Sequence, residues 1–212
     1  MKKTGIYVSL LRPVFTALLF GLVMSSFGQD GAIRVKYQGT RPTISDFAEA
    51  YFDTYDIDDE EECADEAIRG FHHAWMNHRK GQPQPEGNTL IVDERNGYIR
   101  FESNATYEQT TSTVRMEMCY WNESDGKHKL FAYSNWLFIN GLPSGGQYDG
   151  LEFFRYDNAT KKMTSCEAPG FDVNYDMTYA LPRTGKDITV TYVRNGKKQQ
   201  KVLKWNGRKF SF

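Results

Sequence analysis

The sequence lacks the short motifs that mark common catalytic sites. It has no G-x-S-x-G nucleophile elbow, no phosphate-binding Gly loop and no H-E-x-x-H zinc motif. The Gly-rich stretch 142–147 lies between predicted strands with no helix start after it, so we do not expect it to cradle a phosphate. The motifs therefore indicate no catalytic residue and no cofactor. An enzymatic site would have to be assembled from scattered residues.

Metal-binding patterns are also missing. His72, His73 and His78 share one predicted helix, but none of their spacings is the i, i+4 separation that puts two ligands on one helix face. The acidic run from Asp53 to Glu62 has no Gly at the bend that a calcium loop needs, and it suits the start of a helix better. We predict no metal site.

Acidic residues are numerous, but no pair is singled out for glycoside hydrolysis. Such a site needs two carboxyl groups within about 5–10 Å. Nothing in the sequence brings together a particular pair from the candidates Glu102, Glu117, Asp149 and Glu152.

Cysteine is scarce, with Cys63, Cys119 and Cys166 the only three. In an oxidising compartment the simplest arrangement is one disulfide and one free thiol, and three pairings are open. Cys119 and Cys166 both fall in strand-like segments, which favours that pair. Three unpaired buried thiols are the alternative.

No apolar run reaches the roughly 20 residues that a spanning helix needs. The longest, Val14–Met24, follows a basic start and precedes the small residues of Ser25–Gly28, as in a secretory signal. We therefore predict a cleavable signal peptide over 1–28, cut before Gln29, and a periplasmic or secreted mature protein. An uncleaved membrane anchor is the alternative.

Both ends of the predicted mature chain carry a resemblance. A cut that leaves Gln29 first is similar to exported proteins of Bacteroidetes-type bacteria, and the segment Lys204–Phe210 resembles the final strand of uncharacterised periplasmic proteins of that group. The resemblance implies a compartment and no activity.

The mature chain has no basic excess. Removing residues 1–28 takes away Lys2, Lys3 and Arg12 and no acidic residue, so 23 of the 26 basic residues remain against 27 acidic ones. This balance argues against binding to nucleic acid or to an anionic membrane. The length of 29–212 suits a single domain.

The first third of that domain reads as helical. Thr43 and Asp46 mark the start of a helix whose apolar stripe runs from Ile44 to Tyr55. A second helix begins in the acidic run 58–62 and stops at Gly81, with Ile68, Phe71 and Trp75 on one stripe. Residues 82–88, rich in Pro and Gly, form a linker.

From residue 89 onward the pattern changes to strands. Four successive hairpins are predicted, with turns at Asn96-Gly97, Ser124–Gly126, Asp157–Thr160 and Asn195-Gly196. We expect an α+β fold in which the two helices cover a meandering antiparallel sheet or sandwich.

Aromatic residues make up 15% of the chain and give the one hint of a binding surface. The central hairpin, 114–139, is apolar on both faces. Either a second layer covers it, or one face exposes an aromatic patch for a protein or a sugar. The patch would include Trp121, Tyr133, Trp136 and Phe138.

These observations favour a non-enzymatic binding or protein-interaction module of the cell envelope. Its partner would be an envelope protein or a glycan, bound by the aromatic face or by the loop Asn140–Asp149. The alternative is an envelope hydrolase with scattered carboxylates or His72 in its site. A purely structural module is a third reading.

Overall fold

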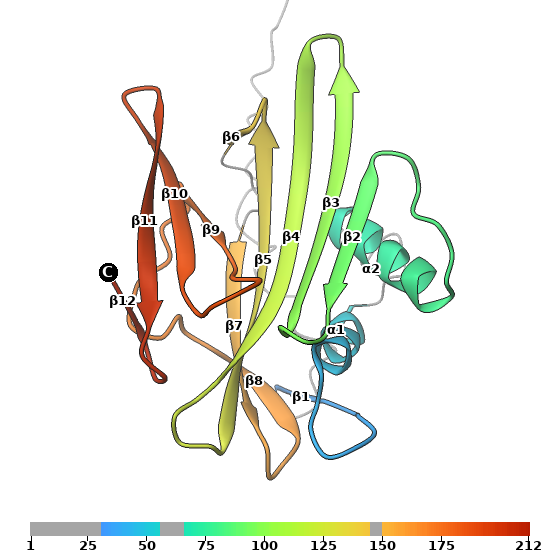
Figure 1. The fold of residues 1–212 in the computed structure, drawn as a ribbon, viewed down its shortest axis with the longest axis vertical. Coiled ribbons are helices and arrows are strands. Elements are labelled where there is room, and N and C mark those ends of the chain that lie inside the picture. The colour runs from blue at the N-terminus through green and yellow to red at the C-terminus, as the bar shows by residue number, and fades with distance from the viewer. Residues whose placement is uncertain (1–30, 56–65, 145–149) are drawn as a thin grey trace, which may run out of the picture.

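The described part of the chain folds into two antiparallel β-sheets and two helices (Figure 1). The computed structural model describes residues 31–55, 66–144 and 150–212. The elements are β1 Ala32–Arg34, α1 Ile44–Phe52, α2 Glu66–Arg79, β2 Asn88–Asp93, β3 Tyr98–Tyr107, β4 Thr110–Asn122, β5 His128–Ile139, β6 Leu142–Pro143, β7 Gly150–Asp157, β8 Lys162–Cys166, β9 Met177–Ala180, β10 Ile188–Arg194, β11 Lys197–Trp205 and β12 Phe210–Ser211. The predicted α+β class, with antiparallel sheet and two helices, is confirmed.

The large sheet is a meander of consecutive strands to which β1 adds as an edge strand. Its strand order is β1-β8-β7-β5-β4-β3-β2, with β6 paired to β5. All four predicted hairpins are present, and three of them lie in this sheet. Another hairpin, between β3 and β4, was not predicted because its turn at Glu108 contains no Gly or Pro, although Glu108 has a φ of 52°.

Three turns of the large sheet depend on an aspartate at their start or within them. Asp93 accepts a hydrogen bond from the Asn96 N–H. The carboxylates of Asp125 and Asp157 likewise accept bonds from the N–H groups two and three residues further on. These short side chains satisfy backbone donors that the tight turns leave unpaired.

Helix α1 begins at the predicted cap, Thr43, and helix α2 ends just before the predicted stop at Gly81. The Thr43 N–H donates to Asp46 at 2.7 Å, which forms the capping box of α1. Helix α2 ends at Arg79, and Gly81, with φ +64°, follows it. The bonds from Gly81 N to His78 O and from Gln82 N to Asn77 O complete a Schellman cap. The predicted acidic start of α2, residues 58–62, lies outside the described residues.

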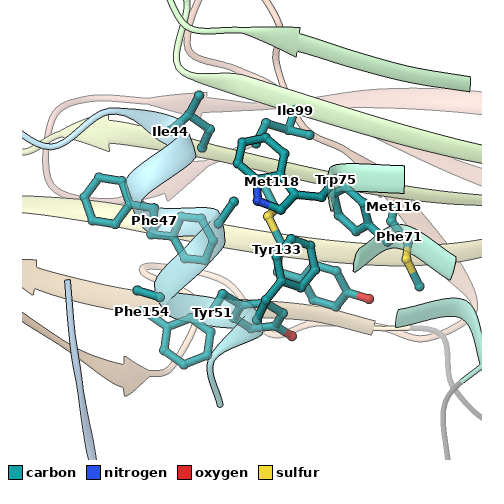
Figure 2. Close-up of a cluster of buried hydrophobic side chains, with 14 of the residues drawn as sticks. Ile44, Phe47, Tyr51, Phe71, Trp75, Ile99, Met116, Met118, Tyr133 and Phe154 are labelled. Carbon is teal, nitrogen blue, oxygen red and sulfur yellow. The ribbon is translucent and has the colours of Figure 1, made fainter. Parts of the chain in front are cut away.

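Both helices pack on one face of the large sheet, as Figure 2 shows. Phe47 and Tyr51 of α1 lie against Phe131 and Tyr133 of β5, with ring centroids 5.6 and 4.8 Å apart. Burial of these aromatic side chains is the main source of stability at this interface.

The small sheet, in the order β12-β11-β10-β9, covers the opposite face. Trp121, Phe153 and Phe210 meet there with ring centroids 5.3 to 6.4 Å apart. The central part of the large sheet is therefore buried on both faces, which explains why the central hairpin is apolar on both sides of the alternation.

The predicted Cys119–Cys166 disulfide is wrong, since both residues carry free thiols. Cys119 lies on β4 and Cys166 on β8, with β5 and β7 between them. Strands about 4.8 Å apart put the two roughly 14 Å from each other, whereas a disulfide spans less than about 7 Å. Cys63 lies outside the described residues.

Candidate functional site

The four aromatic residues predicted to form a binding surface belong to the core. Trp121, Tyr133 and Trp136 are at most 4% exposed and Phe138 is 9% exposed. Tyr133 lies under the helices and the other three lie under the small sheet. The expectation of an exposed aromatic patch on this hairpin is therefore wrong, and the alternative, a second covering layer, is confirmed.

The helix histidines do not gather into a site. His72 packs edge-on against Phe52, and the His78 ring lies 5.9 Å from that of Trp75. His73 is exposed. Within the described residues, none of the three belongs to a group of potential metal ligands.

One group of potential ligand atoms does occur, at the β4–β5 turn. Atoms of Glu123, Asp125 and His128 lie within 4.8 Å of one another. Arg155 already donates to both carboxylate oxygens of Glu123, at 2.8 and 2.5 Å, and lies 3.6 Å from Asp125. A guanidinium among the carboxylates repels a cation, so this is an ion-pair network of a turn.

The described carboxylates suggested for glycoside hydrolysis have separate structural partners. Glu102 pairs with Arg115 at 2.6 Å. Glu152 accepts a hydrogen bond from the Tyr51 hydroxyl on the helix side of the sheet. Asp149 lies outside the described residues.

Glu117 is the remaining candidate, and it is buried between the sheets. It accepts bonds from the Tyr98 hydroxyl at 2.5 Å and from the Leu181 N–H at 2.8 Å. Burial raises the pKa of this carboxyl, and these two bonds oppose the rise. The cleft beside Glu117 measures about 80 Å³, below the roughly 300–1,000 Å³ of ligand pockets. We therefore assign Glu117 a structural role, which is to hold the 181–187 loop on the sheet.

A cavity of ligand size opens at the end of β8. It measures about 730 Å³, and we call it the β8 groove. Its lining residues are Leu151, Glu152, Phe153, Ser165, Cys166, Glu167, Ala168, Gly170, Phe171, Asp172, Val173 and Tyr175. A second cavity of about 580 Å³ shares residues 166–168 and 170 with it and reaches Arg155 and Arg208.

The groove has an apolar floor and a polar rim. Phe153, Cys166 and Phe171 belong to or pack against the inter-sheet core, so they form the floor. Glu167 and Asp172 are exposed at the rim, and Tyr175 stands beside them with 63% of its surface exposed. No Lys or Arg is among the lining residues.

The loop that forms one wall, residues 167–176, is held in place by hydrogen bonds from backbone N–H groups. The Phe210 N–H donates to the Pro169 carbonyl at 2.8 Å, and the Asn174 N–H donates to the Tyr179 hydroxyl at 2.9 Å. Gly170 has a φ of +90°, and a Cβ there would come within 2.5 Å of the Phe210 carbonyl oxygen. The groove is therefore shaped before any ligand arrives.

The groove also borders the end of β8 that lies beyond its pairing with β1. β1 pairs with residues 162–164 of β8, and Gly31, the residue before β1, has a φ of +62°. Among the described strands, none pairs with Ser165 or Cys166 on the side away from β7. A strand edge of this kind is a template for another extended chain.

Comparison with known proteins identifies no family for this chain. No protein-family model, curated protein or solved structure matches the chain. The resemblance to exported Bacteroidetes proteins remains a prediction.

Sequence reasoning missed the β8 groove because its residues look like an ordinary loop. The one available signal was the pair of aromatic residues, Phe171 and Tyr175, in a stretch with acidic neighbours and a Pro-Gly turn at 169–170. Aromatic side chains in a loop between strands need either a core or a ligand to cover them.

Proposed function

We propose that the protein is an exported, non-enzymatic binding module that takes up an extended, basic segment of a partner protein in the β8 groove. The single observation that carries the proposal is the groove itself, which has an apolar floor, an acidic rim and, beside it, a strand edge that no described strand covers. Export is supported by the signal-like pattern of residues 1–28. Among the described residues, no helix has the length and apolar character that spanning a membrane requires.

The strand edge supports an extended ligand. A peptide that adds to β8 would continue the sheet where β1 leaves it, with backbone hydrogen bonds beside Ser165 and Cys166. In such binding the backbone supplies affinity, and pockets for alternate side chains supply specificity. The floor at Phe153 and Phe171 would receive one apolar side chain.

The rim supports a basic ligand. Glu167 and Asp172 have no ion-pair partner among the described residues, and both are exposed to a ligand in the groove. Tyr175 adds an aromatic surface on which a Lys or Arg side chain of the partner can rest. Charge of this kind at a rim favours fast and selective association.

A peptide array tests the proposal. The protein, expressed with its N-terminal segment so that any cleavage occurs in the host, is exposed to ten-residue peptides with alternating apolar positions. The remaining positions carry Lys and Arg, Glu, or Ser. We expect selective binding of the basic series, and protection of the β8 amides from hydrogen exchange when such a peptide is bound.

Two variants and a control locate the site. Ala168→Arg fills the groove, and Glu167→Lys reverses the charge of the rim. Each should weaken binding of the basic peptide at least tenfold. Glu86→Lys makes the same charge change at an exposed position of the 82–88 linker and should leave binding within about twofold. Binding that survives Ala168→Arg, or an array with no preference for basic peptides, would refute the proposal.

A further inference from the structure

The charges of the chain are divided sharply along its length. All 27 acidic residues precede Ile188, whereas seven basic residues follow it: Arg194, Lys197, Lys198, Lys201, Lys204, Arg208 and Lys209. This acid-free segment is the β10–β11 hairpin with β12. Figure 1 shows that the tip of the hairpin stands clear of the large sheet.

Like charges face each other at this tip. Arg194 lies directly opposite Lys197 in the antiparallel ladder, and Lys198 follows next to them. All three are exposed, and among the described residues none has an ion-pair partner within 4 Å. Directly opposed like charges destabilise a strand pair. A counter-charge from outside the chain would relieve this repulsion.

One face of the hairpin gathers the groups that such a ligand would meet. In the ladder register, Arg194 and Lys197 share a face with Lys201, Tyr192 and Gln199. Side chains two positions apart on a strand stand about 6.8 Å from each other, so Lys197, Gln199 and Lys201 form an evenly spaced row. The Lys201 Nζ lies 5.4 Å from the Tyr192 ring centroid and 5.2 Å from that of Phe212.

We propose that this face of the β10–β11 hairpin binds a linear acidic polysaccharide, a glycan that carries carboxylate or sulfate groups along its chain. The row of cations would pair with the anionic groups. The amide of Gln199, which accepts a bond from the Tyr192 hydroxyl at 3.2 Å, offers donors to sugar hydroxyls. The site is separate from the β8 groove and takes a ligand of opposite charge.

Two other polyanions fit this surface less well. Single-stranded nucleic acid binds through base stacking on aromatic rings, but Lys201 already sits over both Tyr192 and Phe212. An anionic membrane binds surfaces that also bury a continuous apolar face. The exposed Val193 and Val202 stand apart in the ladder, with Val193 opposite Lys198 and Val202 opposite Thr189.

Binding of defined probes by the full chain tests the inference. The probes are a heparin oligosaccharide and a polygalacturonate oligomer, with neutral dextran, single-stranded DNA and vesicles with anionic lipid headgroups as comparisons. We expect both acidic glycans to bind, binding to weaken as salt is added, and dextran not to bind. Tighter binding of DNA or vesicles than of the glycans would overturn the proposal.

A charge-matched pair of variants assigns the site. The hairpin variant carries Arg194→Gln, Lys197→Gln and Lys201→Gln, and the control carries Lys80→Gln, Arg95→Gln and Lys127→Gln at other exposed positions. We expect the hairpin variant to bind the acidic glycans at least tenfold more weakly and the control to bind within about twofold of the parent. Equal losses would mean that only net charge matters, which would refute the site.

Stability provides a readout that does not depend on binding. Because the hairpin variant removes opposed like charges, its melting temperature should equal or exceed that of the parent. A folded, more stable protein with weakened glycan binding supports the proposal. Salt-dependent self-association of the parent, lost in the hairpin variant without any glycan binding, would overturn it in favour of a second copy of the chain as the ligand.

Discussion

The indole N–H of Trp136 donates a hydrogen bond of 3.0 Å to the carbonyl oxygen of Tyr179, which ties β5 of the large sheet to β9 of the small one. Trp121 makes the equivalent bond, at 2.8 Å, to the carbonyl of Lys186 just before β10. Two tryptophans that suggested a binding surface thus provide polar links between the layers of the fold.

The substitution Trp136→Phe tests this role. It keeps an aromatic ring in the core but removes the donor, so the buried Tyr179 carbonyl loses its partner. We expect the free energy of unfolding to fall by about 1–3 kcal/mol for the lost bond, in addition to the loss of buried ring area. Urea denaturation followed by circular dichroism measures the change.

Trp75→Phe is the matched control. Trp75 is as deeply buried under the helices, but its indole nitrogen has no hydrogen-bond partner among the described residues. The same loss of ring area there removes an unsatisfied donor and should cost less than Trp136→Phe. If the two variants lose equal stability, the hydrogen bond to Tyr179 contributes nothing.

Local features of the fold could be read from the sequence because their causes are local. The turn at Asn96-Gly97, the cap at Thr43 and the stop at Gly81 each depend on a residue type at one position. The alternation along β4 and β5 indicated two apolar faces, and the structure buries Met116 and Met118 on one and Cys119 and Trp121 on the other. These patterns fix elements and faces, but not what covers each face.

Which layer covers a face depends on the whole chain, and for this reason the prediction of an exposed aromatic patch was wrong. Trp121 and Trp136 look alike in a buried layer and in an exposed patch, because alternation is the same in both cases. Segment 177–180 is only four residues long, so β9 and its contact with Trp136 went unpredicted. The β8 groove depends on the approach of Gly170 to Phe210, forty residues later, which no local pattern encodes.

The turn aspartates predict loss of stability in acid. Hydrogen bonds from His128 and from backbone N–H groups lower the pKa of Asp125, and backbone bonds from Ala159 and Thr160 lower that of Asp157. A carboxyl with a folded-state pKa below its ordinary 3.8 contributes stability above that pH, and the contribution is lost as pH falls through the lower folded value. We expect the melting temperature to drop steadily below pH 3.8.

The substitution Asp157→Asn should reduce the change of melting temperature with pH. Asparagine still accepts the turn hydrogen bonds but cannot titrate, so the variant should be less stable at neutral pH and lose less on acidification. Asp176→Asn, at an exposed loop position, is the control and should follow the parent curve. The comparison uses melting temperatures from pH 7 to pH 2, and parallel curves for Asp157→Asn and the parent would contradict the assignment.

Cys166 should be reachable but slow to react. It lines the β8 groove, and burial raises the pKa of its thiol to about 11, so about one thiol in ten thousand is ionised at pH 7. We expect slow alkylation by iodoacetamide at pH 7 that accelerates towards pH 10, and no reaction at the buried Cys119 in the folded protein. Peptide mass spectrometry follows each site, and rapid modification of Cys166 at pH 7 would show an activated thiolate instead.

Gly170→Ala should deform the β8 groove. Any L residue at φ +90° is strained by about 1–2 kcal/mol. The added Cβ would also meet the Phe210 carbonyl oxygen at 2.5 Å, so the 167–176 loop must move away from β12. We expect a loss of stability of about 2–4 kcal/mol in total and faster alkylation of Cys166.

The control Gly185→Ala separates backbone strain at a positive φ from the contact between the added Cβ and the Phe210 carbonyl oxygen. Gly185 has a similar φ of +82°, but a Cβ there meets no atom within 4 Å, so this variant carries only the backbone strain. It should lose about 1–2 kcal/mol and leave the alkylation rate of Cys166 unchanged. If the two alanine variants have the same melting temperature and the same alkylation rate of Cys166, then the contact between Gly170 and Phe210 does not shape the groove. In that case the β8 groove is not a rigid binding site.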